Sequence, residues 1–254
     1  MTMTDAEHKA NYQKQVDDRH AKGDLSIPPF LDRRPIVWTP TMLLAYRDNC
    51  PHQLDQRSIA KKIPFVSTPE MDWGNQCHDA LEHRVLPGRK QLPESMRHFE
   101  PMVAQFDGYP VRAEARLAVN RNWEPVDYFA KDVWGRGRAD LVIINETTAY
   151  IGDWKSGNVR ENPGEIKMHA ALLAMKYPQI ETFKGQYLWL KEMRAGELYD
   201  LSDIDGTCDE IEELYAKIMH DREFDAFEKR PSGLCGWCPV EDCEHYYISP
   251  KRMK

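Results

Sequence analysis

The stretch RADLVIINETTAYIGDWKSG, residues 138–157, contains two apolar runs on either side of the polar tetrapeptide NETT. Two such runs around a short polar turn are typical of a β-hairpin. If the hairpin folds about the centre of NETT, Asp140 lies opposite Asp153, because both are equally distant from that point. Directly opposed residues have Cβ atoms about 4.5–5.5 Å apart, and two like charges at that distance destabilise the pair.

A bound cation would change the sign of this interaction, because hard divalent cations take carboxylate oxygens as ligands. Residues two apart in a strand share a face, so Lys155 points to the same side as Asp153. An ammonium in that position can stabilise a developing negative charge. In the alternative interpretation both aspartates are solvated at a sheet end, and Lys155 forms a surface ion pair that contributes little. The apolar runs on both strands favour the metal site.

Other segments carry the patterns of regular secondary structure. Apolar residues at helical spacing predict helices over residues 39–50, 71–86, 163–178 and 209–227. Alternating apolar and polar residues predict strands over residues 109–120 and 182–193. This order of elements predicts an α/β domain with a small mixed sheet.

Length and composition predict a single sizeable domain, because the chain has 254 residues of which 41% are hydrophobic. The polar, proline-ending segment 1–36 is expected to be a flexible N-terminal arm. Residues 37–254 are expected to form one domain that includes a cysteine-rich tail over 232–246.

The net charge of −7 argues against a general nucleic-acid coat protein but allows a local basic patch. No apolar run is long enough to span a membrane, and the N-terminal residues lack the apolar core of a signal peptide. We therefore expect a cytoplasmic protein without a membrane partner. In a reducing compartment the six cysteines are expected to be thiols or metal ligands rather than disulfides.

The tail CGWCPVEDC, residues 235–243, has the C-x2-C-x4-C spacing of a metal site, which indicates as ligands Cys235, Cys238 and Cys243. The alternative, three unrelated buried cysteines, suits a short and turn-rich tail poorly. A fourth ligand is needed, and His245 would complete a Cys3His zinc site. Cys77 and Cys208 fit no such spacing and are interpreted as packing residues.

Basic residues are scattered along the chain, and most of them fit a solvated surface. Arg136 and Arg138 are the exceptions, because they alternate along the strand that carries Asp140. We expect these two arginines to contact a nucleic-acid backbone.

The motifs GRAD (137–140) and GDWKSG (152–157) resemble those of the PD-(D/E)xK nuclease superfamily, and within it the RecB-like and Cas4-like exonuclease branch. TPTMLLAYRDNCP resembles the branch's amino-terminal helix, GNQCHDALEHRV its histidine-bearing helix, and CGWCPVEDC its carboxy-terminal cysteine cluster. The resemblance covers roughly residues 37–246 in the expected order. It implies a restriction-endonuclease-like core with a small mixed sheet flanked by helices, whose N- and C-terminal segments join at a cysteine-rich metal site.

The resemblance also implies roles for individual residues. Asp140 and Asp153 would be metal-binding catalytic carboxylates, and Lys155 would position or activate the attacking water. The backbone carbonyl of Trp154 and the side chain of His78 would be further metal ligands. One or two Mg²⁺ or Mn²⁺ ions would suit these ligands better than zinc or copper.

Glu114 matches an acidic residue of the first core strand and is the fourth candidate catalytic residue, although a solvated glutamate is the alternative. It lies on the polar face of the strand expected over 109–120. The opposite, apolar face is expected to consist of Ala113, Ala115, Leu117 and Val119.

For the cysteine tail the resemblance implies Cys50 as the fourth ligand and a [4Fe-4S] cluster that links the two ends of the domain. A structural Zn²⁺ site with His245 remains the alternative. The chain departs from the branch at a glutamine and a tyrosine four residues apart on the helix after the lysine, where it has Lys167 and Ala171. This departure leaves strand handling and substrate preference open.

These features together predict a metal-dependent DNA nuclease, and most specifically an exonuclease on single-stranded or resected DNA ends. Its expected setting is recombination, repair or phage DNA metabolism, with a recombination or replication protein as partner. The alternatives are an endonuclease or RNase with the same core, or a non-catalytic nucleic-acid-binding or assembly factor. Digestion polarity and oligomeric state cannot be predicted from these residues.

Overall fold

The computed structural model describes residues 35–247, so the expected N-terminal arm lies outside the described residues except for its last two. The helices are α2 (Pro40–Asp48), α3 (Pro51–Leu54), α4 (Pro69–Val85), α5 (Glu100–Val103), α6 (Gly164–Lys176) and α7 (Ile204–Phe224). Short helical turns are η1 (Asp55–Ile59), η2 (Glu94–Phe99), η3 (Ala104–Phe106) and η4 (Cys235–Trp237). The strands are β1 (Val111–Val119), β2 (Gly135–Asn145), β3 (Thr148–Lys155), β4 (Thr182–Trp189), β5 (Arg194–Ala195) and β6 (Tyr199–Asp200).

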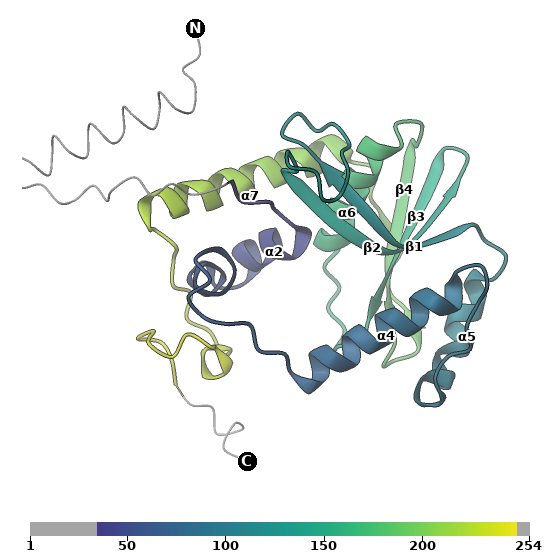
Figure 1. The fold of residues 1–254 in the computed structure, drawn as a ribbon, viewed down its shortest axis with the longest axis horizontal. Helices are drawn as coiled ribbons and strands as arrows, with labels where there is room; N and C mark the ends of the chain where they lie inside the picture. Colours follow the sequence, from purple (N-terminus) through teal and green to yellow (C-terminus); the bar gives the residue numbers. More distant parts are fainter. Residues whose placement is uncertain (1–34, 248–254) are drawn as a thin grey trace, which may run out of the picture.

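The six strands form one mixed sheet in the order β1-β2-β3-β4-β5, with β6 also paired to β4 (Figure 1). Strands β1, β2 and β3 are antiparallel, and β4 runs parallel to β3. A parallel neighbour needs a crossover connection, which α6 provides between β3 and β4. The expected α/β class with a small mixed sheet is confirmed.

The hairpin of β2 and β3 has the register that the sequence predicts. Asn145 pairs with Thr148 and Leu141 with Gly152, so the turn is centred between Glu146 and Thr147. Glu146 has a left-handed φ of 50°, which such a tight turn requires.

Threonine followed by proline begins two of the helices that carry the site. The hydroxyl of Thr39 accepts from the amide of Met42 at 3.2 Å, and that of Thr68 accepts from the amide of Met71 at 3.4 Å. The next residue is a proline in both cases, whose missing N–H costs nothing at the first helical position. The helix expected over 209–227 begins earlier, at the start of α7, and the strand expected over 182–193 ends earlier, at the end of β4.

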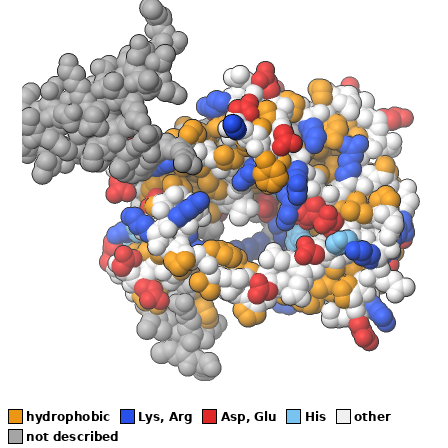
Figure 2. All heavy atoms as spheres, viewed as in Figure 1, with side chains coloured by type: hydrophobic (Ala, Val, Ile, Leu, Met, Phe, Trp, Pro, Cys, Tyr) orange, Lys and Arg blue, Asp and Glu red, His pale blue; other side chains and the backbone are white. Residues whose placement is uncertain are grey.

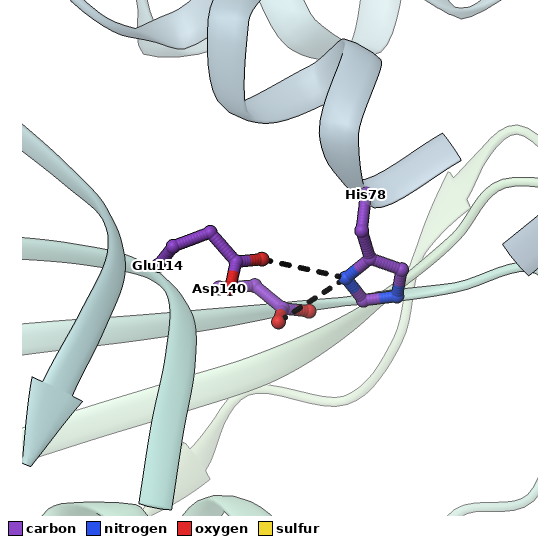
Figure 3. A group of neighbouring side chains, drawn as sticks. All are labelled: His78, Glu114 and Asp140. Atoms are coloured by element: carbon purple, nitrogen blue, oxygen red, sulfur yellow. Dashed lines mark ion pairs between the residues drawn. The ribbon is translucent and has the colours of Figure 1, made fainter. Parts of the chain in front are cut away.

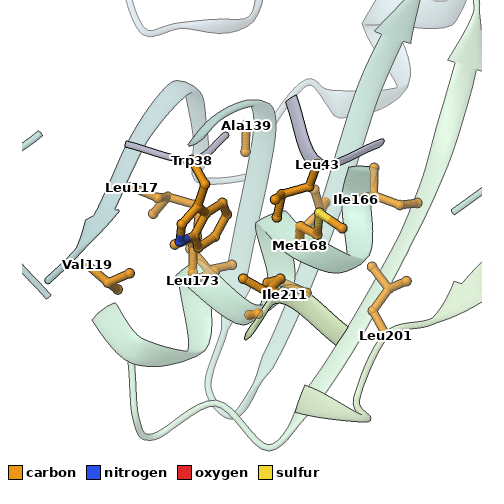
Figure 4. Close-up of a cluster of buried hydrophobic side chains, with 14 of the residues drawn as sticks. Trp38, Leu43, Leu117, Val119, Ala139, Ile166, Met168, Leu173, Leu201 and Ile211 are labelled. Carbon is orange, nitrogen blue, oxygen red and sulfur yellow. The ribbon is translucent and has the colours of Figure 1, made fainter. Parts of the chain in front are cut away.

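The sheet is covered on both faces. Helices α2, α6 and α7 pack on one face around a large apolar cluster. Figure 4 labels part of this cluster: Trp38, Leu43, Leu117, Val119, Ala139, Ile166, Met168, Leu173, Leu201 and Ile211. A second cluster, under α4 and α5 on the other face, contains Cys77, Leu81, Phe99, Val103, Leu141 and Trp154. The sheet centre is therefore a rigid platform for side chains at its edge.

Strand β1 changes sides at Glu114, which has a left-handed φ of 49°. Val111 and Ala113 pack with the α4 cluster, whereas Ala115 and the residues after it pack with the α6 cluster. The expectation that Ala113 shares one face with Ala115, Leu117 and Val119 is therefore wrong. A non-glycine residue in this conformation stores strain, and such strain concentrates at functional sites.

The two cysteines interpreted as packing residues do pack with the core, Cys77 inside it and half-buried Cys208 against it. Cys77 is fully buried in the α4 cluster, and Cys208 packs against the α6 cluster. No helix within residues 35–247 is long and apolar enough to cross a membrane.

Candidate active site

Three acidic residues lie side by side on three adjacent strands. Ala113 pairs with Leu141 and Ala115 with Ala139, so Glu114 lies opposite Asp140. Leu141 pairs with Gly152, so the next position along places Asp153 opposite Asp140. Asp140 and Asp153 are buried and Glu114 is half-buried. We call these three residues the carboxylate row.

Helix α4 places His78 over this row (Figure 3). The Nδ1 atom of His78 is 3.2 Å from Asp140 Oδ1 and 3.8 Å from Glu114 Oε1. Each of the three residues has a ligand atom within 4.8 Å of the others, the spacing at which one metal ion can bind all three. Carboxylates with one imidazole form a donor set suited to Mg²⁺ or Mn²⁺.

The proton on His78 reflects the surplus of negative charge at the site. Burial disfavours the imidazolium, but hydrogen bonds to Asp140 and Glu114 outweigh this effect and raise the pKa of His78 to about 10. Without a cation, the imidazole of His78, an expected metal ligand, therefore holds a proton. A metal ion would have to displace that proton.

Asp140 is oriented by the backbone of the neighbouring strand. The N–H of Trp154 donates to Asp140 Oδ2 at 2.8 Å, which leaves Oδ1 facing His78. The N–H and C=O of one strand residue point to the same side of the strand. The carbonyl of Trp154 therefore points toward Asp140 as well.

Lys155 lies between two carboxylates, with its Nζ 2.7 Å from Asp153 Oδ2 and 2.7 Å from Glu165 Oε2. Burial disfavours the ammonium, but both carboxylates outweigh it, so the pKa of Lys155 is raised. Burial raises the pKa of Asp153 too; Lys155 opposes that rise, and the charge of Asp140 adds to it. A cation beside Asp153 would relieve this excess of negative charge.

Glu165 and His169 are the residues near the site that sequence patterns did not identify. They lie four apart on α6 and so share a helix face. His169 is buried, and burial lowers its pKa. Ala171, at one of the family's glutamine/tyrosine positions, is fully buried in the core instead. The four-residue spacing of Glu165 and His169 on the helix after the lysine was the available signal.

The glycine of the GRAD motif allows α6 to approach the sheet. A Cβ at Gly137 would lie 2.8 Å from His169 Cδ2 and 3.1 Å from a methyl group of Leu172. Such contacts are closer than packed side chains tolerate, so Gly137 is required by the position of His169.

The predicted arginines lie next to the carboxylate row. Arg138 is exposed, Arg136 is half-buried, and both share the alternation of Asp140 along β2. The Nε of Arg138 pairs with Glu114, and Arg116 of β1 lies directly opposite Arg138. The site thus has a carboxylate row and, one step along the same two strands, a pair of opposed arginines.

The cysteine tail packs against the N-terminal end of the described chain. A pocket of about 450 Å³ is lined by Cys50, His52, Gln53, Cys235, Cys238, Cys243 and His245. Three of the sulfurs accept N–H bonds: Cys50 from the amide of Arg230 at 3.4 Å, Cys235 from that of Ser232 at 3.3 Å, and Cys238 from the side chain of Gln53 at 3.6 Å.

The spacing of these sulfurs bears on the group they could hold. Within residues 35–247, no three cysteine or histidine ligand atoms of this pocket lie within 4.8 Å of one another. In a tetrahedral zinc site the Zn–S bonds of about 2.3 Å bring the ligand sulfurs closer together than that. As they stand, these side chains are not assembled around a single ion, and thiols that accept N–H bonds serve as ligands in both zinc and iron–sulfur sites.

Figure 2 shows acidic and histidine side chains gathered beside a hollow on one face of the molecule.

No curated protein sequence is significantly similar to this chain. Two solved structures are similar over nearly their whole length. SSO0001 is 15% identical with a TM-score of 0.46, and covers 96% of this chain and 97% of its own. A candidate exonuclease from Eubacterium rectale is 9% identical with a TM-score of 0.53, and covers 100% of this chain and 98% of its own.

The second likeness concerns the fold alone, because the identity is low. The sequence profile of the PD-(D/E)XK nuclease superfamily, by contrast, matches residues 44–243, a span that contains the carboxylate row, His78 and Lys155. The chain therefore belongs to the PD-(D/E)XK nuclease superfamily, whose members are metal-dependent nucleases acting on nucleic acids.

Proposed function

We propose that this chain is a metal-dependent exonuclease of the RecB-like and Cas4-like branch that acts on single-stranded or resected DNA ends. The observation that carries the proposal is the meeting of His78, Glu114 and Asp140 within 4.8 Å of one another. On the next strand Asp153 and Lys155 lie 2.7 Å apart. The candidate ligands and a fixed cation thus lie together across strands β1, β2 and β3, beneath α4.

In this proposal Asp140, Asp153, Glu114 and His78 hold one or two Mg²⁺ or Mn²⁺ ions, together with the carbonyl of Trp154. Bound metal would neutralise charge on the scissile phosphate and lower the pKa of a water molecule. The chain's own contribution is orientation, because the Trp154 amide fixes one oxygen of Asp140 and leaves the other toward His78.

Lys155 is proposed to position the attacking water and to balance charge as the phosphate reacts. Its ammonium is fixed between Asp153 and Glu165 and cannot easily lose its proton. A half-buried, charged lysine of this kind suits electrostatic stabilisation of an anionic transition state.

The arginine pair supports binding of a phosphate backbone. Arg116 and Arg138 lie directly opposite each other, and although Arg138 pairs with Glu114, the two guanidiniums place positive charge beside the carboxylate row. The ring of Tyr128 lies 5.1 Å from the guanidinium of Arg136 and holds it near this pair. We propose that Arg136 and Arg138, joined by Arg116, contact phosphates beside the carboxylate row.

The cysteine pocket is proposed to hold a [4Fe-4S] cluster on Cys50, Cys235, Cys238 and Cys243. The meeting of these four cysteines in one pocket and the N–H bonds to three of their sulfurs support this proposal, and a zinc site that includes His245 is the alternative. The cluster would join the two ends of a single nuclease domain over residues 37–254. Recombination, repair or phage DNA metabolism in the cytoplasm, with a recombination or replication partner, remains the proposed setting.

The test uses protein purified without oxygen and two single-stranded DNA substrates, one linear and end-labelled, the other circular. With Mg²⁺ or Mn²⁺ we expect loss of the linear substrate only, and no loss with Asp153→Asn. The matched control is Asp200→Asn, because Asp200 also lies on a strand 2.7 Å from a lysine, Lys184, but is exposed. This control should keep full activity.

Three outcomes would replace the proposal. Cutting of the circle would indicate an endonuclease, and preferential loss of an RNA substrate of the same sequence would indicate an RNase. Binding of DNA without cutting would indicate the non-catalytic factor. Ala171 is consistent with that outcome, because it is buried at a position where the family has a glutamine or tyrosine.

A further inference from the structure

An exposed apolar segment joins the cysteine pocket to the candidate active site. Residues 60–73, which we call the strap, link η1 to α4 and include the first turn of α4. Every residue from 64 to 73 is exposed, including four large apolar side chains: Phe65 at 66%, Val66 at 71%, Met71 at 42% and Trp73 at 36%. Four large exposed apolar side chains within nine residues exceed the singly scattered ones of an ordinary surface and point to a binding surface.

The strap ends at the candidate site. A Cβ at Gly74, the residue after the strap, would lie 3.2 Å from the hydroxyl of Ser156, which follows Lys155. Met71, Gly74 and His78 are three and seven residues apart along α4, and so lie on one side of the helix. Met71 therefore faces the same side as the metal-facing histidine, about 10 Å along the helix axis.

Cations accompany the apolar side chains of the strap. Lys61 and Lys62 are both exposed, and Lys61 has a left-handed φ of 53°. The guanidinium of Arg57 lies 5.9 Å from the ring of Phe65. Figure 1 shows the segment crossing from the cysteine-rich end of the molecule to the start of α4, and Figure 2 shows hydrophobic side chains beside the hollow there.

Exposed aromatic rings among lysines suit an unpaired nucleic-acid strand, because bases stack on the rings while phosphates contact the cations. A duplex offers no free base faces to such a surface. We propose that the strap binds the unpaired bases of the substrate strand, with Phe65 as a stacking residue and Met71 as the apolar contact on the side of His78, and leads that strand to the carboxylate row. This inference rests on the proposed function and adds to it the surface and the side chains that would bind the unpaired strand.

The test compares the unaltered protein with Phe65→Ala and Met71→Ala on three substrates: a single-stranded oligonucleotide, the same strand with abasic residues, and thymidine 5′-(p-nitrophenyl phosphate). We expect each variant to raise KM for the intact strand, Phe65→Ala by roughly tenfold, within the range found for loss of one stacked base. The small ester is too short to reach the strap, so its kcat and KM should not change. Phe224→Ala, which removes a 50% exposed phenylalanine on α7, is the matched control and should behave as the unaltered protein.

A KM that stays unchanged, or that rises equally for the abasic strand, would overturn the inference while leaving the proposed nuclease in place. If the unaltered protein cleaves no substrate, the proposed function fails. Fluorescence anisotropy of the labelled strands in Ca²⁺ then decides the strap separately, with weaker binding of Phe65→Ala to the intact strand as the supporting result. Loss of self-association in Phe65→Ala with unchanged DNA binding would assign the strap to a contact between copies and overturn the inference.

Discussion

At the scale of single residues, the ammonium of Lys155 is fixed by Asp153 and by Glu165, whose other oxygen accepts from Thr41 at 3.2 Å. Glu165→Gln keeps the size of this side chain and removes its charge. We expect kcat on linear single-stranded DNA to fall by about 10- to 100-fold, as for partners that orient a metal site. KM should change little, because Glu165 holds Lys155 and no phosphate.

The control for Glu165 is Glu213→Gln, since Glu213 also pairs with a lysine, Lys217, but on the exposed side of α7. Equal kcat values for the two variants would refute the positioning role. If circular dichroism shows that the folded fraction of Glu165→Gln falls as much as its kcat, the fall in kcat would be due to lost stability and not to the position of Lys155.

Gly137 gives a second prediction at this scale, one about packing. Gly137→Ala forces its new methyl group to within 2.8 Å of His169 Cδ2, so we expect unfolding free energy to fall by about 1–3 kcal/mol, as in overpacked cores. Gly157→Ala is the control, because a Cβ at Gly157 meets nothing within 4 Å. Urea denaturation measures both variants, and equal midpoints would show that α6 can move away from the sheet.

At the scale of elements, the β2–β3 hairpin could be predicted to the residue because its register depends only on a local turn. The conformation of Glu114 could not, because its left-handed φ follows from how β1 packs against two different clusters. Glu165 was missed for another reason. The resemblance to the family concerned Lys167 and Ala171 on this helix. Which side of α6 faces Lys155 depends on how the helix packs on the sheet, and that side carries Glu165.

The junction of α3 and η1 carries a prediction about pH. Asp55 is buried there, and burial raises the pKa of its carboxyl. A raised pKa in the folded state means that its contribution to stability is fully present below the ordinary pKa of about 4 and is lost as pH rises through the folded value. Asp55→Asn should therefore stabilise the protein at pH 7 and change its stability little near pH 4. Thermal unfolding at both pH values tests this, and an equal effect at the two values would contradict it.

At the scale of the whole molecule, the two ends of the domain meet at the cysteine pocket. Cys50 precedes α3, and three other lining cysteines lie in the tail. The spacing C-x2-C-x4-C predicted a metal site in the tail, whereas the meeting with Cys50 depends on the path of the entire chain. A group bound to both would close a loop of nearly the whole domain, which stabilises the fold by several kcal/mol in order of magnitude.

Cys50→Ser tests whether such a closure exists. In protein purified without oxygen we expect the variant to lose the broad absorbance of an iron–sulfur cluster at about 400 nm, and to unfold at a lower temperature. Cys208→Ser is the control, because Cys208 packs against the core away from the pocket and should keep the absorbance. Unchanged absorbance in Cys50→Ser would exclude Cys50 as a ligand. Colourless protein that contains zinc would indicate His245, and not Cys50, as the fourth metal ligand. The segment around Cys50 would then be held to the tail by packing alone.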